Sequence, residues 1–252
     1  MKGTSHQATN TPCQDYSLFK IIEKDSSQTI IAVASDGAGS ASHAELGSNF
    51  ICNKFIKDIS TNLEDGFAVE DFTHNFFKNW IERFQEDLQK EVLSEDLNLR
   101  NYACTILGAI VGDNSACFIQ IGDGAIVVDE DEAKYDFMFL PQQGEYANQT
   151  YFATEPSAKD NLQFLYIDRR ICELALFTDG IQNLVINFQT LEVNNDFFSQ
   201  WFEWLVEVEE NAGKLSLEVY LDSRKINQRT DDDKTLVLAV RLDAASAQTS
   251  NN

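Results

Sequence analysis

The fold is decided by residues 30–40, which read Ile-Ile-Ala-Val-Ala-Ser-Asp-Gly-Ala-Gly-Ser. The apolar, β-branched run from Thr29 to Ala34 predicts a buried strand. The dipeptide Asp36-Gly37 that follows it predicts a tight turn. A carboxylate at the end of a buried strand costs desolvation energy unless it is paired or bound to a metal. The stretch therefore predicts a core strand with a functional acid at its end.

Other aspartates also stand beside predicted strands. They are Asp15 before Tyr16–Ile22, Asp123 between two glycines after Cys117–Ile121, Asp179 after Leu174–Phe177, and Asp231, Asp232 and Asp233 before Thr235–Leu242. A single Asp-Gly is an ordinary turn. Several such acids on one rim would form an oxygen-rich site for Mg²⁺ or Mn²⁺. The spacing alone leaves a set of turns and a metal site equally open.

The remaining pattern predicts antiparallel sheets covered by helices. Apolar periodicity predicts helices over Ala44–Ile59, Val69–Leu93, Asp196–Val208 and Lys214–Tyr220. Close spacing predicts a meander of Cys104–Val111, Cys117–Ile121 and Ala125–Val128, and a further pair of Phe164–Ile167 with Leu174–Phe177. Strands and helices do not alternate, which favours the α+β class over a parallel sheet. We expect one domain over residues 1–245 and a fraying polar tail over 246–252.

Composition limits the partners. The chain has 41 Asp and Glu against 19 Lys and Arg, a formal net charge of −22, so nucleic acid and anionic membranes are excluded as expected partners. Five scattered cysteines without a Cys-x-x-Cys pair favour a reducing cytoplasm. We expect no secretory signal, no membrane span, and a monomer.

Five segments, in this order and spacing, resemble the PP2C-type (PPM) metal-dependent protein phosphatases, above all their bacterial PP2C-like branch. They are Ser5-His6 to Pro12-Cys13-Gln14-Asp15, Ala34-Ser35-Asp36-Gly37-Ala38-Gly39-Ser40, Ile121-Gly122-Asp123-Gly124, Phe177-Thr178-Asp179-Gly180-Ile181 and Asp232-Asp233-Lys234-Thr235-Leu236-Val237. The resemblance implies a four-layer α-β-β-α sandwich with two central antiparallel sheets. It also implies hydrolysis of phosphoserine and phosphothreonine in phosphoprotein substrates by a water that two Mg²⁺ or Mn²⁺ ions activate.

The resemblance assigns roles to individual residues. Asp36 would bridge the two metals, with the Gly37 carbonyl as a further ligand. Asp179 and Asp232 would complete the coordination of the second metal. Asp15 would hold metal-bound water, and Asp123 would bind a third, weaker metal.

Two departures from the family pattern concern the substrate. Asn10 stands where many relatives carry a phosphate-binding arginine, so His6 or Lys2 is a candidate substitute for it. Asn10 itself and Gln14, beside Asp15, are further candidates for binding substrate. A surface role for His6 stays open. Ala38 stands where many relatives carry a histidine that acts as general acid, and His43 is the nearest histidine. These departures keep open an alternative: a catalytically weak or inactive module that binds phosphoproteins.

Two loops complete the predictions. Gly144–Pro156 lies where the family carries a flap beside the active site, and it either selects substrates or serves as a connector. The acidic run Asp129–Glu132 is expected to be a solvated loop.

Overall fold

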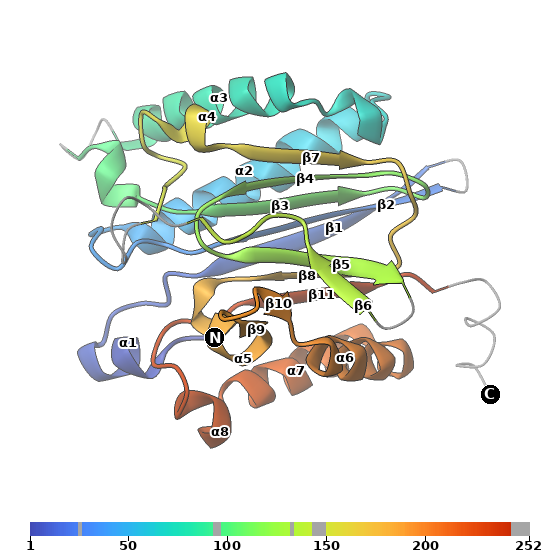
Figure 1. The fold of residues 1–252 in the computed structure, drawn as a ribbon. Helices are drawn as coiled ribbons and strands as arrows, with labels where there is room; N and C mark the ends of the chain where they lie inside the picture. The colour runs from blue at the N-terminus through green and yellow to red at the C-terminus, as the bar shows by residue number, and fades with distance from the viewer. Residues whose placement is uncertain (25–26, 93–96, 132–133, 143–149, 243–252) are drawn as a thin grey trace.

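The structure is a computed structural model that describes residues 1–24, 27–92, 97–131, 134–142 and 150–242. Two antiparallel sheets lie between two helical layers (Figure 1). The first sheet has the order β1 (Tyr16–Lys24), β2 (Ser27–Ser35), β3 (Ile106–Val111), β4 (Ala116–Ile121) and β7 (Gln163–Ile167). The second has the order β11 (Leu236–Val240), β8 (Glu173–Phe177), β5 (Ala125–Asp131) and β6 (Lys134–Phe137).

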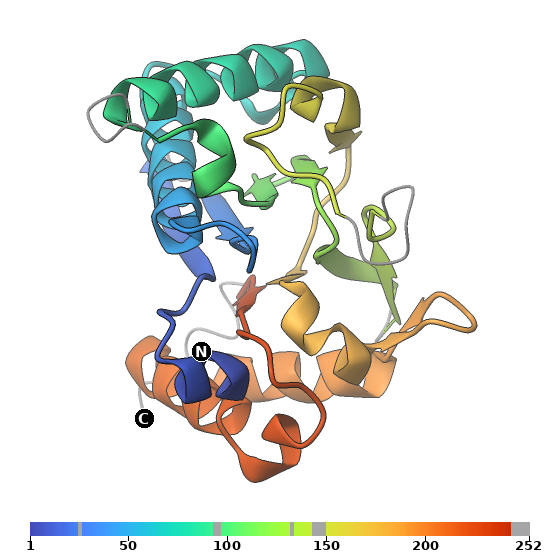
Figure 2. The ribbon, with the colours of Figure 1, turned by 90° about the vertical axis from the view of Figure 1, so that its left-hand side faces the viewer.

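Two long helices cover each outer face of the sandwich. These are α2 (Ala44–Glu64) and α3 (His74–Val92) on the first sheet, and α6 (Asn195–Glu207) and α7 (Glu210–Leu221) on the second (Figures 1 and 2). The expected α+β class and α-β-β-α layering are therefore confirmed. The shorter elements are α1 (Thr4–Thr9), η1 (Val69–Asp71), η2 (Leu99–Tyr102), α4 (Ala158–Asn161), η3 (Asp179–Ile181), α5 (Gln182–Val185), β9 (Ile186–Asn187), β10 (Glu192–Val193) and α8 (Arg224–Asn227).

Strand alternation explains why the core has three apolar layers. In β2, Ile31 and Val33 pack into the layer under α2 and α3, whereas Ala32 and Ala34 pack into the layer between the sheets. Successive side chains of a strand point to opposite faces, so a strand that is apolar throughout is buried on both.

Two predicted strand pairings are wrong. β4 and β5 do not form a hairpin, because β4 pairs with β3 and β7 while β5 pairs with β6 and β8. Likewise β7 and β8 lie in different sheets. Gly122 has a φ of 119°, which glycine adopts without strain, and the turn at Gly122–Gly124 carries the chain from one sheet to the other. Spacing could not distinguish such a crossing from a hairpin.

Two other predictions need correction. The helix expected from Val69 begins at His74, because Val69–Asp71 forms a separate 3₁₀ turn, and its predicted last residue, Leu93, lies outside the described residues. The acidic run is not simply a loop, since β5 continues to Asp131. The Asp129 carboxylate also accepts the backbone N–H groups of Cys172 and Glu173, each at 2.8 Å.

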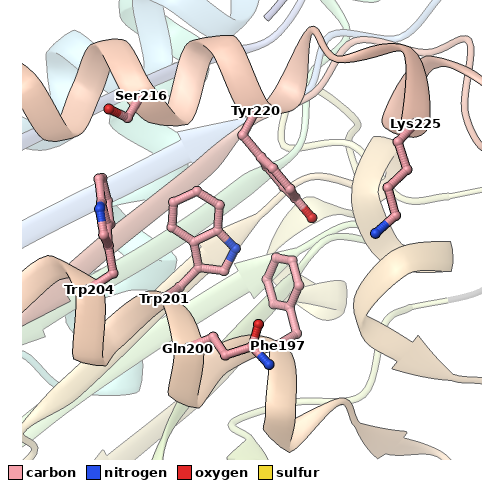
Figure 3. Close-up of a pocket in the computed structure, with 7 residues that line it drawn as sticks. All are labelled: Phe197, Gln200, Trp201, Trp204, Ser216, Tyr220 and Lys225. Carbon is pink, nitrogen blue, oxygen red and sulfur yellow. The ribbon is translucent and has the colours of Figure 1, made fainter.

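Aromatic side chains fill most of the space between α6 and α7. The rings of Trp201 and Tyr220 stand edge to face, 4.8 Å apart. They leave a cavity of about 390 Å³, lined by Phe197, Gln200, Trp201, Trp204, Ser216, Tyr220 and Lys225 (Figure 3). None of the predicted site residues lines this cavity. Within the described residues, no helix is long and apolar enough to cross a membrane.

Candidate metal centre at the strand ends

Three predicted acids converge at one end of the sandwich. Asp36 follows β2 of the first sheet, Asp179 follows β8 of the second, and Asp123 stands in the turn between β4 and β5. One carboxylate oxygen from each lies within 4.8 Å of the other two. Residues far apart in the sequence therefore present oxygen atoms to a common point, as a hard divalent cation requires.

Thr105 fixes the backbone around Asp36. The Asp36 N–H donates to Thr105 Oγ1 at 2.9 Å, and the Thr105 N–H donates to the Asp36 carbonyl at 2.8 Å. The Ser35 hydroxyl adds a bond of 2.6 Å to the Thr105 carbonyl. Thr105 was not predicted as a site residue, and its position just before β3 carries no distinctive sequence signal.

Asp15 lies beside this cluster and is 9% exposed. Its Oδ2 accepts the Thr178 hydroxyl at 2.7 Å, and Thr178 Oγ1 in turn accepts the Thr235 N–H at 3.1 Å. The side chains of Asp15 and Asp36 are hydrogen-bonded to each other, which requires a proton on one of the two carboxyls. Thr178 is thus a supporting residue that the sequence reasoning missed, although it stands directly before Asp179.

The carboxyls of the centre resist ionisation. Burial raises the pKa of Asp15 to about 6, and burial together with the charges of Asp123 and Asp232 raises the pKa of Asp179 to about 8. The pKa of Asp36 is raised well above its ordinary value by burial and by the charges of Asp15 and Asp179. Burial also raises the pKa of Asp123. The main neighbours acting on these groups are other carboxylates, so a divalent cation is the counter-charge that this donor set fits.

Asp232 and Gly37 lie next to the cluster. Asp232 is exposed and is not one of the three converging acids, but its charge raises the pKa of both Asp123 and Asp179. The Gly37 N–H donates to the Gln14 carbonyl at 3.1 Å, and a Cβ at Gly37 would lie 2.7 Å from the Ala44 carbonyl oxygen. Only glycine therefore fits at the start of this loop.

Two of the predicted substrate residues, His6 and Gln14, meet at the Asp233 carboxylate, and the third, Asn10, does not. His6 Nδ1 and Asp233 Oδ2 are 2.9 Å apart, whereas Asn10 is exposed at the end of α1. Gln14 is 4% exposed, and its Oε1 has no hydrogen-bond partner among the described residues. His43 stacks on Tyr102 with ring centroids 5.2 Å apart.

Ala38 lies in a small apolar cluster. It packs with Ala41, Ala44, Ala103 and Phe152, so the position of the family histidine is occupied by apolar packing. Of the predicted flap, Gly144–Gln149 lies outside the described residues, as does the predicted tail over 246–252.

Comparison with known proteins identifies the family. The family model described as "Protein phosphatase 2C" matches residues 2–222. This chain belongs to the protein phosphatase 2C family. It is therefore a protein phosphatase by family, as the five motifs indicated.

Relatives of this protein phosphatase 2C member agree. It is 33% identical over 243 residues to "Serine/threonine-protein phosphatase 3" of Escherichia coli strain K12, covering 94% of both chains. Its fold matches that of Stp1, a serine/threonine phosphatase from Staphylococcus aureus, with a TM-score of 0.62 and 16% identity over 92% of this chain and 90% of that one. It also matches RsbX, solved in complex with magnesium, with a TM-score of 0.51 and 16% identity over 90% of this chain and 86% of that one.

Proposed function

We propose that this protein removes phosphate from phosphoserine and phosphothreonine side chains of protein substrates, using divalent cations held by Asp36, Asp179, Asp232 and Asp123. The observation that carries the proposal is the convergence of Asp36, Asp123 and Asp179 within 4.8 Å. The names of the Escherichia coli relative and of Stp1 support the substrate class, and magnesium in RsbX supports the type of ion.

Bound Mg²⁺ or Mn²⁺ would supply Lewis-acid chemistry, which makes water nucleophilic at neutral pH and offsets charge on the phosphoryl oxygens. The protein's own residues prepare this site. Burial raises the pKa values of both Asp36 and Asp15, and cation binding would favour their ionised forms. Asp15, held by Thr178, is then an ionised acceptor that can orient water in the centre.

Substrate binding rests on neutral groups rather than on an arginine. Gln14 keeps Oε1 free beside the centre, and its amide group is the candidate contact for substrate or for ordered water. Asn10 and His6 stay proposed substrate contacts. All five cysteines are free thiols, which supports a reducing cytoplasm as the proposed location, and a monomer is the proposed state.

The proposal is tested with purified protein, p-nitrophenyl phosphate and a phosphothreonine peptide. Turnover should require Mn²⁺ or Mg²⁺ and stop with a chelator. Asp36→Asn and Asp179→Asn should each reduce kcat by more than the roughly 10–100-fold that loss of an outer-shell partner typically costs. Asp113→Asn, in the distant β3–β4 turn, is the matched control and should keep wild-type turnover.

Two outcomes would count against this function. Turnover that ignores both the chelator and the two substitutions would remove the metal mechanism. Tight binding of Mn²⁺ and phosphopeptide without turnover would instead support the phosphoprotein-binding alternative, which no observation in the described residues favours at present.

A further inference from the structure

The side chain of Asp233 joins three separate parts of the chain. It is 2% exposed, and its Oδ1 accepts the Gly3 N–H at 2.6 Å. Its Oδ2 accepts the Gln14 N–H at 2.6 Å and lies 2.9 Å from His6 Nδ1. We call these four residues the Asp233 junction. Bonds of this kind to a buried carboxylate are charge-assisted and short, and they are costly to lose.

Backbone packing holds the junction from two further sides. A Cβ added to Gly3 would collide with the backbone of Asp231 and Asp232. A Cβ added to Gly180 would collide with the Asp233 carbonyl. The segment around Asp233 is therefore held closely between residue 3 and residue 180, with no room for another side chain.

Two residues of the junction, and the glycine packed against it, lie next to predicted metal-centre residues. Gln14 precedes Asp15, Asp233 follows Asp232, and Gly180 follows Asp179. The 2.6 Å bond from Gln14 to Asp233 spans 219 residues of sequence and ties the Asp15 segment to the Asp232 segment directly. Asp232 is exposed, and its Oδ1 accepts the backbone N–H of Asp233 at 2.8 Å, so its placement depends on the neighbouring residue.

We propose that Asp233, together with His6, is a positioning residue of the phosphatase: the junction sets the backbone of Asp15 and Asp232 so that their carboxylates reach the cations held by Asp36 and Asp179. This inference rests on the proposed function. It gives His6 a role through Nδ1 that is separate from any contact of its other ring nitrogen with substrate. It also gives Asp233 a role different from that of Asp232, its neighbour in the acidic run.

The test measures Mn²⁺ affinity by calorimetry on metal-depleted protein, together with kcat and KM for p-nitrophenyl phosphate. Asp233→Ala removes all three acceptor contacts and should weaken Mn²⁺ binding about 10–100-fold, as the loss of groups that orient metal ligands does. Asp233→Asn keeps one acceptor oxygen and should be intermediate. His6→Ala removes one contact and should have a smaller effect in the same direction.

A kinetic signature separates positioning from general damage to the fold. In the two Asp233 variants, raising the Mn²⁺ concentration should restore kcat toward the wild-type value while KM stays unchanged, because the groups that hold the cations are intact. The matched control is Asp113→Ala, which breaks the 2.9 Å ion pair with Arg241 at the opposite end of the sandwich. It should lower thermal stability and leave Mn²⁺ affinity unchanged.

The outcomes are distinguishable. If Asp233→Ala does not fold, the test rests on Asp233→Asn and His6→Ala. The proposal is overturned if both of these folded variants bind Mn²⁺ with wild-type affinity. If the wild type itself binds no Mn²⁺, or if Asp36→Asn binds it as tightly as the wild type, the proposed function fails first. If Asp36→Asn abolishes binding and the junction variants do not weaken it, the positioning role fails alone.

Discussion

Removing one carboxylate from the centre should stabilise the metal-free protein at neutral pH. The change is Asp179→Asn. In the absence of cations, Asp179 is buried beside Asp123, Asp232 and Asp15, and these surroundings raise its pKa from 3.8 to about 8. Asparagine has a similar shape and carries no charge, so it removes this electrostatic conflict.

The sign and size follow from proton linkage. A carboxyl whose pKa is higher in the folded state contributes stability that is complete below the unfolded pKa and is lost as pH rises through the folded pKa. Between pH 5 and pH 7, the folded protein keeps a proton on Asp179 that the unfolded chain has already lost. The free energy of unfolding should then fall by about 1.4 kcal/mol per pH unit, or about 3 kcal/mol over the window.

The assay is urea unfolding in EDTA at pH 5, 6 and 7, for the wild type and for Asp179→Asn. The wild type should lose about 3 kcal/mol relative to the variant, a large share of the 5–15 kcal/mol of a typical domain. Groups remote from Asp179 are common to both proteins and cancel in the comparison. Asp113→Asn serves as the control, because the pKa of Asp113 is lowered and not raised. Parallel pH profiles for the wild type and Asp179→Asn would refute the reasoning.

Two further predictions concern the core. Lys234 is 0% exposed and donates to Asn227 Oδ1 at 2.7 Å, so Asn227→Ala should deprive a buried ammonium of this hydrogen bond and lower the free energy of unfolding by about 1–3 kcal/mol. Asn183→Ala is the control, and equal stability of Asn227→Ala and wild type would contradict the role. Trp80 is 0% exposed and donates to Asp58 at 2.9 Å, so Trp80→Ala should cost about 3–5 kcal/mol in chemical denaturation; a cost under about 1 kcal/mol would mean that its layer repacks.

Much of the fold could be predicted from the sequence, because each core layer leaves a local pattern. The continuous apolar run Ile31–Ala34 and the helical stripe through Phe77, Trp80 and Phe84 both indicate burial. Pairing between strands could not be predicted in this way. β4 and β5 are separated by a short glycine turn, and only the φ of Gly122 and the partners of β5 show that the chain changes sheets there.

In the candidate site, too, residues that follow a local pattern could be predicted, and residues placed by tertiary contacts could not. Asp36, Asp123 and Asp179 were found from their places after apolar strands, and the structure brings them together. Thr105 and Thr178 could not be found, because a threonine that supports an aspartate through one hydrogen bond has no spacing rule. Asp232 is exposed and Asp233 is buried, and this difference also depends on tertiary contacts. Two adjacent aspartates in a sequence do not reveal it.

The candidate metal centre lies between the two sheets, and this position has a mechanical consequence. Asp36 belongs to one sheet and Asp179 to the other, so an ion shared between them would be a reversible crosslink between the sheets at that end of the sandwich. At the far end the sheets are joined by an ion pair of the protein itself, since Arg241 after β11 donates to Asp113 beside β3. Without its ion, the catalytic end places carboxyls with raised pKa values on both sides of the seam, and ionising them would push the two sheets apart there.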